Sequence, residues 1–304
     1  MAEQAAAASA RGIRHSFADV NGARLHYAHS GEGRLILFLH GFPEFWYAWR
    51  NQLAEFGRDC LAVAPDMRGY NLSSKPEKVE DYEMNHLVGD IVALIGNLGA
   101  KSCCLVGHDW GGVVAWVTAI ARPEIIEKLV IINAPHPAIF QRELRENPAQ
   151  QQASQYMLMF RTPPQAEQML SAENCALLQQ IVLSEGLRDG YVTEADQRAY
   201  LEAWTQPGAL TGGLNYYRAA RVGPVSGESQ NAFHGLEEQT SLQVNVPTMV
   251  IWGESDTALL TGNLDGLDRY VPNMFIKRIP DATHWIVHEK SHLVNSLIRD
   301  FISH

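Results

Sequence analysis

Short apolar runs, separated by longer stretches with helical spacing, are the feature of this sequence that most restricts its fold. Five compact runs end near Gly, Pro, Asp or Asn, at residues 35–39, 60–64, 103–106, 129–132 and 248–252, and a sixth strand is predicted at 274–279. The five runs lack apolar–polar alternation, which is typical of parallel strands that are covered on both faces. The segments 85–99 and 110–120 show helical spacing. We therefore predict a doubly wound, mostly parallel α/β sheet.

The strand–helix rhythm breaks after about residue 135 and returns near residue 246. The stretch between is rich in Gln, Glu, Arg and Met and has helical segments but no convincing strand. Ligands of open α/β sheets bind beyond the carboxyl ends of the strands, so a helical insertion there would enclose a site. We predict a core at 15–135 and 240–304, a helical lid at 136–235, and a flexible tail at 1–14 that lacks the pattern of a signal peptide.

Charge and cysteine content exclude several classes of function. The chain has 24 Lys and Arg against 34 Asp and Glu, a net charge of −10, which disfavours nucleic acid and anionic lipid as partners. No apolar stretch approaches the roughly 20 residues that a membrane span needs. The cysteines Cys60, Cys103, Cys104 and Cys175 have no zinc-binding spacing, and the adjacent pair suits burial on opposite faces of a strand. We expect a reduced, cytoplasmic protein.

The segment Gly107-His-Asp109-Trp-Gly111 lies directly after a predicted strand and before a predicted helix. Its spacing is that of a nucleophile elbow, where glycines allow a tight turn. Asp109 occupies the position at which esterases carry serine. A carboxylate that attacks saturated carbon forms an ester that water can cleave, whereas serine would leave an ether. Taken alone, Asp109 could instead be an aspartate that caps the following helix.

On this motif the sequence resembles the α/β-hydrolase superfamily, in the branch shared by soluble epoxide hydrolases and haloalkane dehalogenases. The family's chain order of nucleophile, acid and histidine assigns the acid to Asp256 and the base to His284. His284 would take a proton from the water that attacks the ester, and Asp256 would fix its tautomer. Some dehalogenases place the acid after the preceding strand, near Asn133, which cannot serve as an acid.

The segment His40-Gly-Phe-Pro43 matches the HGxP turn of the family. In the family the backbone N–H groups at the positions of Phe42 and Trp110 hold the oxyanion. We therefore expect a cis Phe42–Pro43 peptide bond, although only about 5–6% of X–Pro bonds are cis. Glu44 follows this turn without an assigned role.

Two tyrosines of the predicted lid lie where epoxide hydrolases carry the residues that hold the oxirane. Residue by residue, the resemblance assigns them to Tyr156 and Tyr217, with Tyr216 as the nearest competitor. A phenol, with an ordinary pKa of about 10, stays protonated at neutral pH and can protonate an alkoxide. The resemblance, which begins near residue 15 and includes no additional N-terminal domain, implies hydrolysis of a small apolar epoxide by water, without metal or cofactor.

Two other functions are weighed against this one. A haloalkane dehalogenase could use Trp110 for the halide, but Phe42 lacks a side-chain donor where such enzymes often carry Asn. A non-catalytic ligand receptor of the same fold would need neither an intact triad nor both tyrosines. The substrate stays open, although Met157, Met159, Met169, Phe160 and Trp204 suggest an apolar pocket. A homodimer is possible.

The histidines His284, His288 and His292 are spaced four apart and would share one face of a helix. Such spacing can indicate a metal site. However, His284 is assigned to the triad, and no carboxylate or cysteine completes a ligand set. We expect a solvated helix face here.

Overall fold

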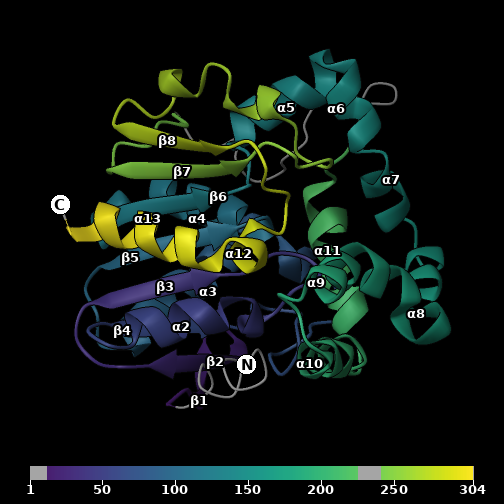
Figure 1. Cartoon of the computed structure of the whole chain (residues 1–304), viewed down its shortest axis with the longest axis horizontal. Helices are drawn as coiled ribbons and strands as arrows, with labels where there is room; N and C mark the ends of the chain where they lie inside the picture. The colour runs from purple at the N-terminus through teal and green to yellow at the C-terminus, as the bar shows by residue number, and fades with distance from the viewer. Residues whose placement is uncertain (1–11, 225–240, 304) are drawn as a thin grey trace.

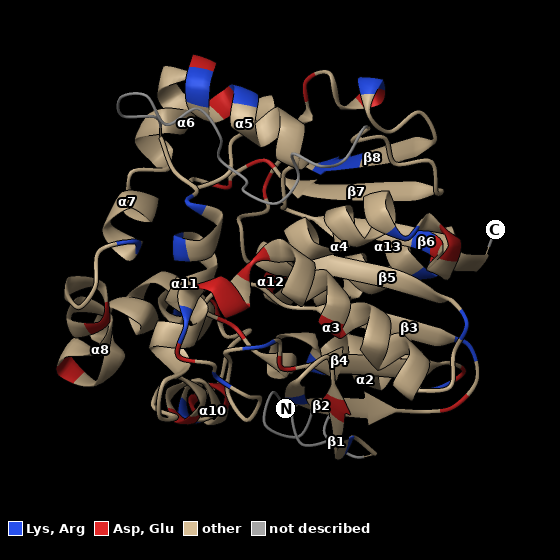
Figure 2. Cartoon of the chain, turned by 180° about the vertical axis from the view of Figure 1, so that it is seen from behind, with Lys and Arg blue, Asp and Glu red and all other residues tan. Residues whose placement is uncertain are grey.

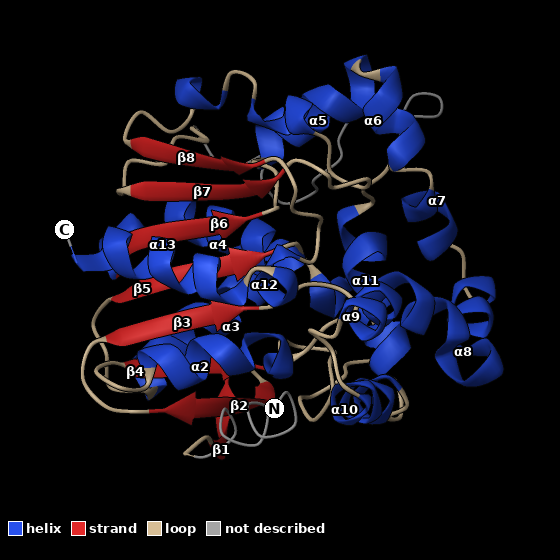
Figure 3. Ribbon diagram, in the orientation of Figure 1, coloured by secondary structure: helices blue, strands red, loops and turns tan. Residues whose placement is uncertain are grey.

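The computed structural model describes residues 12–224 and 241–303. Its centre is an eight-stranded sheet with the order β1-β2-β4-β3-β5-β6-β7-β8, which is antiparallel at β1, β2 and β4 and parallel from β4 to β8 (Figure 3). The strands are β1 Arg14–Val20, β2 Ala23–Ser30, β3 Leu35–Leu39, β4 Leu61–Pro65, β5 Cys103–His108, β6 Ile126–Ile132, β7 Thr248–Gly253 and β8 Met274–Ile279. The predicted mostly parallel α/β sheet is confirmed.

Successive residues of the central strands face opposite sides of the sheet, and both sides are covered. Leu37 and Cys103 belong to the apolar cluster under α3 Met84–Asn97 and α4 Trp110–Ala121. Phe38 and Cys104 belong to the cluster under α2 Arg50–Phe56, α12 Ile286–Glu289 and α13 Ser291–Ser303 (Figure 1). The adjacent cysteines are therefore buried on opposite faces, as predicted.

The hairpin of β1 and β2 was not predicted. Its two-residue turn is Asn21-Gly22, with φ of 48° and 73°. An Asn-Gly pair is a strong sequence signal for such a turn, because both positions need positive φ. Of the predicted tail, residues 1–11 lie outside the described residues, whereas Arg14 already pairs in the sheet.

The chain between β6 and β7 is helical in all of its described elements. They are α5 Pro137–Glu146, α6 Pro148–Ala153, α7 Tyr156–Phe160, α8 Gln165–Leu178, the π-helical turn η4 Gln179–Leu183, α9 Ser184–Asp189, α10 Glu194–Trp204 and α11 Ala209–Ala220. These helices lie beyond the carboxyl ends of the parallel strands (Figures 1 and 3). The predicted lid boundary at residue 235 and the restart of the core at residue 240 lie outside the described residues.

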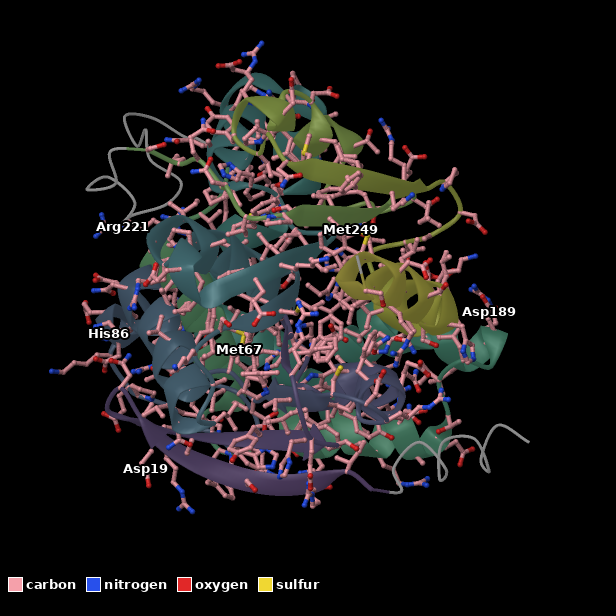
Figure 4. All side chains as sticks on the ribbon, turned by 90° about the vertical axis from the view of Figure 1, so that its left-hand side faces the viewer. Asp19, Met67, His86, Asp189, Arg221 and Met249 are labelled. Atoms are coloured by element: carbon pink, nitrogen blue, oxygen red, sulfur yellow. The ribbon has the colours of Figure 1, made fainter. Side chains whose placement is uncertain are left out.

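Short 3-10 helices complete the described elements. They are η1 Trp46–Trp49, η2 Val79–Tyr82, η3 Pro123–Ile125, η5 Thr261–Leu264 and η6 Leu267–Arg269. The strands β3, β4, β5 and β7 contain no Lys, Arg, Asp or Glu, whereas the outer helices carry both charges (Figure 2). Met67 and Met249 lie among the packed interior side chains, and Asp19 and Arg221 lie at the edge (Figure 4). No helix within 12–224 or 241–303 is long and apolar enough to span a bilayer.

Candidate active site

Asp109 stands in the tight turn between β5 and α4, with φ of 50° and ψ of −125°. The turn passes so close to β3 that a Cβ on Gly111 would lie 2.2 Å from the Leu39 carbonyl oxygen. The Asp109 carboxylate points out of this turn. Its Oδ1 accepts a hydrogen bond of 2.8 Å from the Phe42 N–H, and its Oδ2 lies 3.6 Å from His284 Nε2. The carboxylate is thus exposed to a ligand and within reach of the imidazole.

Asp256, which is buried, and His284, whose side chain is 13% exposed, form a pair at the ends of neighbouring strands. Asp256 follows β7, and its Oδ2 lies 2.7 Å from Nδ1 of His284, which follows β8. The N–H groups of Ala258 and Leu259 donate to Asp256 Oδ1 at 2.8 and 2.9 Å. Burial would raise the pKa of Asp256, but the charge of His284 and these hydrogen bonds lower it. The pair therefore holds a carboxylate against one nitrogen of the imidazole.

The other nitrogen of His284 faces Asp109, and the two carboxylates together set the charge of the ring. Burial alone would lower the pKa of His284. The negative charge of Asp256, and after it that of Asp109, reverse this effect and raise the pKa to about 9. The raised pKa keeps the imidazole protonated at neutral pH.

Asn133 is a positioning residue that sequence reasoning missed. It follows β6, and its side-chain amide donates to Asp256 Oδ2 at 2.8 Å and to the Gly253 carbonyl oxygen at 3.1 Å. Its side-chain oxygen accepts from the Gly253 N–H at 2.8 Å. Asn133 therefore stands at the alternative acid position of some dehalogenases, but it fixes the turn that carries Asp256. Its place at the carboxyl end of a predicted strand was the available signal.

The turn that contains Phe42 lies against the carboxylate of Asp109. The Phe42–Pro43 peptide bond is cis, as predicted, and the Phe42 N–H points at Asp109 Oδ1. Trp110 opens α4, and its ring packs at 5.1 Å from the ring of Tyr217. Among the described residues, the Trp110 N–H makes no hydrogen bond to Asp109. Its part in an oxyanion hole stays a prediction.

The two predicted tyrosines meet above Asp109. Tyr156 comes from α7 and Tyr217 from α11, their ring centroids are 6.3 Å apart, and both line the same cavities as Asp109. Burial, followed by the charge of Asp109, raises the pKa of Tyr156, and burial raises that of Tyr217 well above the ordinary value. Tyr216 points elsewhere and donates to the Arg68 carbonyl oxygen at 2.9 Å. The structure therefore brings Tyr217, rather than Tyr216, to the site.

A cavity of about 310 Å³ extends from Asp109 between the core and the helices that follow β6. Its walls are mainly apolar and include Met159, Phe160, Met169, Leu177, Leu178 and Ile181. Of the methionines and aromatic residues predicted for a pocket, Met159, Met169 and Phe160 line this cavity. Met157 lines a second cavity of about 20 Å³. Trp204 instead donates a hydrogen bond to the Pro43 carbonyl oxygen.

Glu44, whose role the sequence alone leaves open, lies in a buried polar cluster behind His284. Its Oε2 lies 3.1 Å from Nδ1 of His108, whose Nε2 lies 2.8 Å from the carbonyl oxygen of His284. Its Oε1 accepts from Tyr200 at 2.9 Å and lies 2.5 Å from His288 Nε2. Burial would raise the pKa of Glu44, but the charge of His288 and the hydrogen bond of His108 hold it well below the ordinary value.

His108 links Glu44 to the backbone of His284. Both of its ring nitrogens face oxygen atoms, those of the Glu44 carboxylate and the His284 carbonyl. Through these contacts, Glu44 helps to fix the backbone of His284.

The expectation of a solvated histidine face on one helix is wrong. His284 precedes α12, His288 lies within it, and His292 is exposed on α13. His288 is only 6% exposed, because it packs against the carboxylate of Glu44. The three side chains therefore have three different environments.

The chain matches known proteins over nearly its whole length. The model of the α/β hydrolase fold family matches residues 34–291. "AB hydrolase superfamily protein YfhM" of Bacillus subtilis is 40% identical over 96% of this chain and 98% of its own length. "Epoxide hydrolase 4" of Mus musculus is 37% identical over 93% of this chain and 77% of its own length.

Solved structures agree with these relatives. A variant of an epoxide hydrolase from Bacillus megaterium superposes with a TM-score of 0.89 at 40% identity, covering 95% of this chain and 100% of the other. Another variant of that enzyme, complexed with its product (R)-3-[1]naphthyloxy-propane-1,2-diol, gives 0.88 at 39% identity with the same coverage. With the elbow, the acid and the histidine in the family's order, this chain belongs to the epoxide hydrolases of the α/β-hydrolase family.

Proposed function

We propose that this protein hydrolyses epoxides to vicinal diols through a covalent ester on Asp109. One observation carries the proposal: a carboxylate at the nucleophile position faces an imidazole on one side and shares a cavity with two protonated phenols. The names of the relatives, and the diol bound to one of them, support the same reaction. The substrates are a small apolar epoxide and water.

In the first half-reaction, an oxygen of Asp109 attacks one carbon of the oxirane. The carbon–oxygen bond of the ring breaks, and its electron pair stays on the departing oxygen. Tyr156 and Tyr217 hold this oxygen, and one of them gives it a proton. The raised pKa values of both phenols keep them protonated until an alkoxide, which is a stronger base, develops.

In the second half-reaction, water attacks the carbonyl carbon of the ester and His284 takes its proton. The Phe42 N–H, at 2.8 Å from Asp109 Oδ1, stabilises the oxyanion that forms. The tetrahedral intermediate collapses to the carboxylate and releases the diol. The proton that His284 carries in the resting enzyme passes through solvent to the phenolate once the ester has formed. His284 then keeps the proton that it takes from water, so the resting state is restored.

Ester formation itself prepares His284 for this step. The charge of Asp109 is one of the causes that raise the pKa of His284 to about 9. An esterified Asp109 is neutral, so this cause disappears and the pKa of His284 falls. The imidazole therefore becomes a competent base only after the nucleophile has reacted.

We assign the helices between β6 and β7 to a lid, because Tyr156 and Tyr217 both come from them. We also assign the protein to the cytoplasm, a setting that fits four buried cysteines without disulfides.

A single turnover in water labelled with oxygen-18 tests the mechanism. Enzyme in excess is mixed with styrene oxide, and both the diol and the peptide that contains Asp109 are analysed by mass spectrometry. Because water attacks the ester carbonyl, the label should enter Asp109 and be absent from the first diol. Label in the diol at first turnover would rule out the ester, and release of halide from haloalkanes without diol formation would favour a dehalogenase.

A further inference from the structure

The two cavities that meet the reacting groups differ greatly in size. They share Asp109, Tyr156 and Tyr217 but no other wall residue, so they touch these groups from different sides. One holds about 310 Å³ and the other about 20 Å³. The larger can enclose a ring system, whereas the smaller has room for little more than one water molecule.

The small cavity is lined by packed side chains. Val113, Phe140, Met157 and Leu259 line it, and each of them is less than a tenth exposed. Interiors of this kind have few voids and resist extra volume, since side chains that must make room leave their preferred rotamers. A substituent that points to this side is therefore limited to about the size of a methyl group.

The large cavity has mainly apolar walls. Ile181, on the π-helical turn η4, is one of them and is 49% exposed, so this wall lies at the surface of the molecule. Among the described residues, its ionisable wall groups are Asp109, His284 and the two tyrosines, all of which belong to the reacting centre. The remaining wall offers no charged partner for a carboxylate or an ammonium group.

This asymmetry selects among epoxides by their substitution pattern. An oxirane whose oxygen faces Tyr156 and Tyr217 and whose carbon faces Asp109 has the large cavity on one side and the small one on the other. The two substituents of a trans-disubstituted epoxide diverge to opposite sides of the ring. We infer that the site takes terminal epoxides with one bulky, uncharged apolar substituent, and excludes trans-disubstituted epoxides whose second substituent exceeds methyl. This inference rests on the proposed function.

A series of epoxides that share one phenyl group tests how large a substituent the small cavity accepts. Styrene oxide, trans-β-methylstyrene oxide and trans-stilbene oxide carry hydrogen, methyl and phenyl on the second carbon. The kcat/KM for diol formation should fall by less than about 10-fold from the first to the second compound, and by at least about 100-fold from the first to the third. A carboxylate in the para position of styrene oxide should lower kcat/KM by about 10-fold or more, since it enters an apolar wall.

A matched pair of variants locates the restriction. Leu259→Ala enlarges the small cavity, and Leu177→Ala enlarges the large one by the same change of side chain. The ratio of kcat/KM for stilbene oxide to that for styrene oxide should rise about 10-fold or more in the first variant and stay within about 3-fold in the second. Thermal unfolding of both variants establishes that they are folded. The comparison of the three epoxides with the wild-type enzyme tests the inference even if a variant does not fold.

The outcomes separate this inference from the proposed function. Diol formation from stilbene oxide at a rate near that from styrene oxide would overturn the inference and leave the hydrolase intact. An equal change of the ratio in both variants would likewise overturn it. Failure to open any compound of the series would overturn the proposed function, and the inference with it.

Discussion

The core and the helices beyond it hold their parts of the site by different forces. Asp256 accepts hydrogen bonds from two backbone N–H groups, from Asn133 and from His284. Tyr217, in contrast, is held mainly by rings: those of Phe42, Trp110, Phe160 and Tyr156 pack around it at 5.1 to 6.3 Å between centroids. Hydrogen bonds fix direction, whereas ring contacts tolerate small shifts.

This difference suits the two half-reactions. Ester hydrolysis always uses the same atoms, so its base and acid can be fixed. Ring opening must accept oxiranes that carry different substituents, so the phenols gain from packing that can adjust. The largest effects are therefore expected where an atom of the fixed half takes part in covalent chemistry.

Removing the nucleophile or the base should break the fixed half at two distinguishable points. Asp109→Ala should lower turnover by at least roughly 10⁴-fold and form no adduct. His284→Gln should stop at the ester, so that the intact mass rises by one substrate mass. Intact-protein mass spectrometry after incubation with styrene oxide measures both. Equal labelling of the two variants would show that Asp109 is not the nucleophile.

Removing one hydroxyl at a time should test the adjustable half. Tyr156→Phe and Tyr217→Phe keep the ring packing, and each should slow ring opening by roughly 10²-fold. The double variant should fall much further, because one phenol partly covers for the other. Stopped-flow measurement of the alkylation step gives these rates, with Tyr216→Phe as the control that lies outside the cavities. Near-normal epoxide turnover by the double variant would refute the role of the tyrosines.

Glu44→Gln should show how much the fixed half depends on the cluster behind it. The substitution replaces a buried carboxylate that accepts from Tyr200 and lies against two imidazoles with a neutral amide, which should lower the free energy of unfolding by about 2 kcal/mol. It should also lower the pH at which ester hydrolysis loses half its rate. Glu143→Gln, in α5, is a matched control, since its partners Arg142 and Asn147 lie outside the triad. An unchanged pH profile in Glu44→Gln would limit Glu44 to a structural role.

The pKa of His284 also links stability to pH. Its folded value of about 9 exceeds the unfolded value of 6.5. The stabilisation is therefore complete below about pH 6.5 and is lost as pH rises through about 9. Between pH 6.5 and pH 9, the free energy of unfolding of the wild type should fall by about 3 kcal/mol relative to that of His284→Gln. Urea unfolding at each pH measures both values. A pH-independent difference between the two proteins would contradict the raised pKa.

The sequence predicted correctly those elements whose signal lies within one short segment. The runs of β3 and β8 were bounded correctly, because a short apolar run between turn residues is a local signal. The elbow around Asp109 was recognised from its spacing, and the resemblance to the family then assigned Asp256 and His284 by their order in the chain. The hairpin of β1 and β2 was missed because its strands are partly exposed and were not recognised as apolar runs.

The residues that were missed depend on neighbours far away in the sequence. Asn133 contacts Asp256 because β6 lies beside β7 in the sheet, although the two residues are 123 positions apart. Glu44 meets His288 across 244 positions. The spacing of residues within one segment does not predict contacts with distant segments. The polar cluster behind His284 could therefore be found only in the three-dimensional structure.

The positive φ of Asp109 implies a conflict between durability and chemistry at one residue. A side chain at φ of 50° is strained, and glycine would occupy this position at lower cost. Asp109→Gly should therefore unfold at a higher temperature than Asp109→Ala, and its free energy of unfolding should be larger by about 1 kcal/mol. At most positions the order is the reverse, because alanine restricts the unfolded chain more than glycine does. A search for thermostable variants that ignores activity would be drawn to glycine here, and would lose the enzyme in doing so.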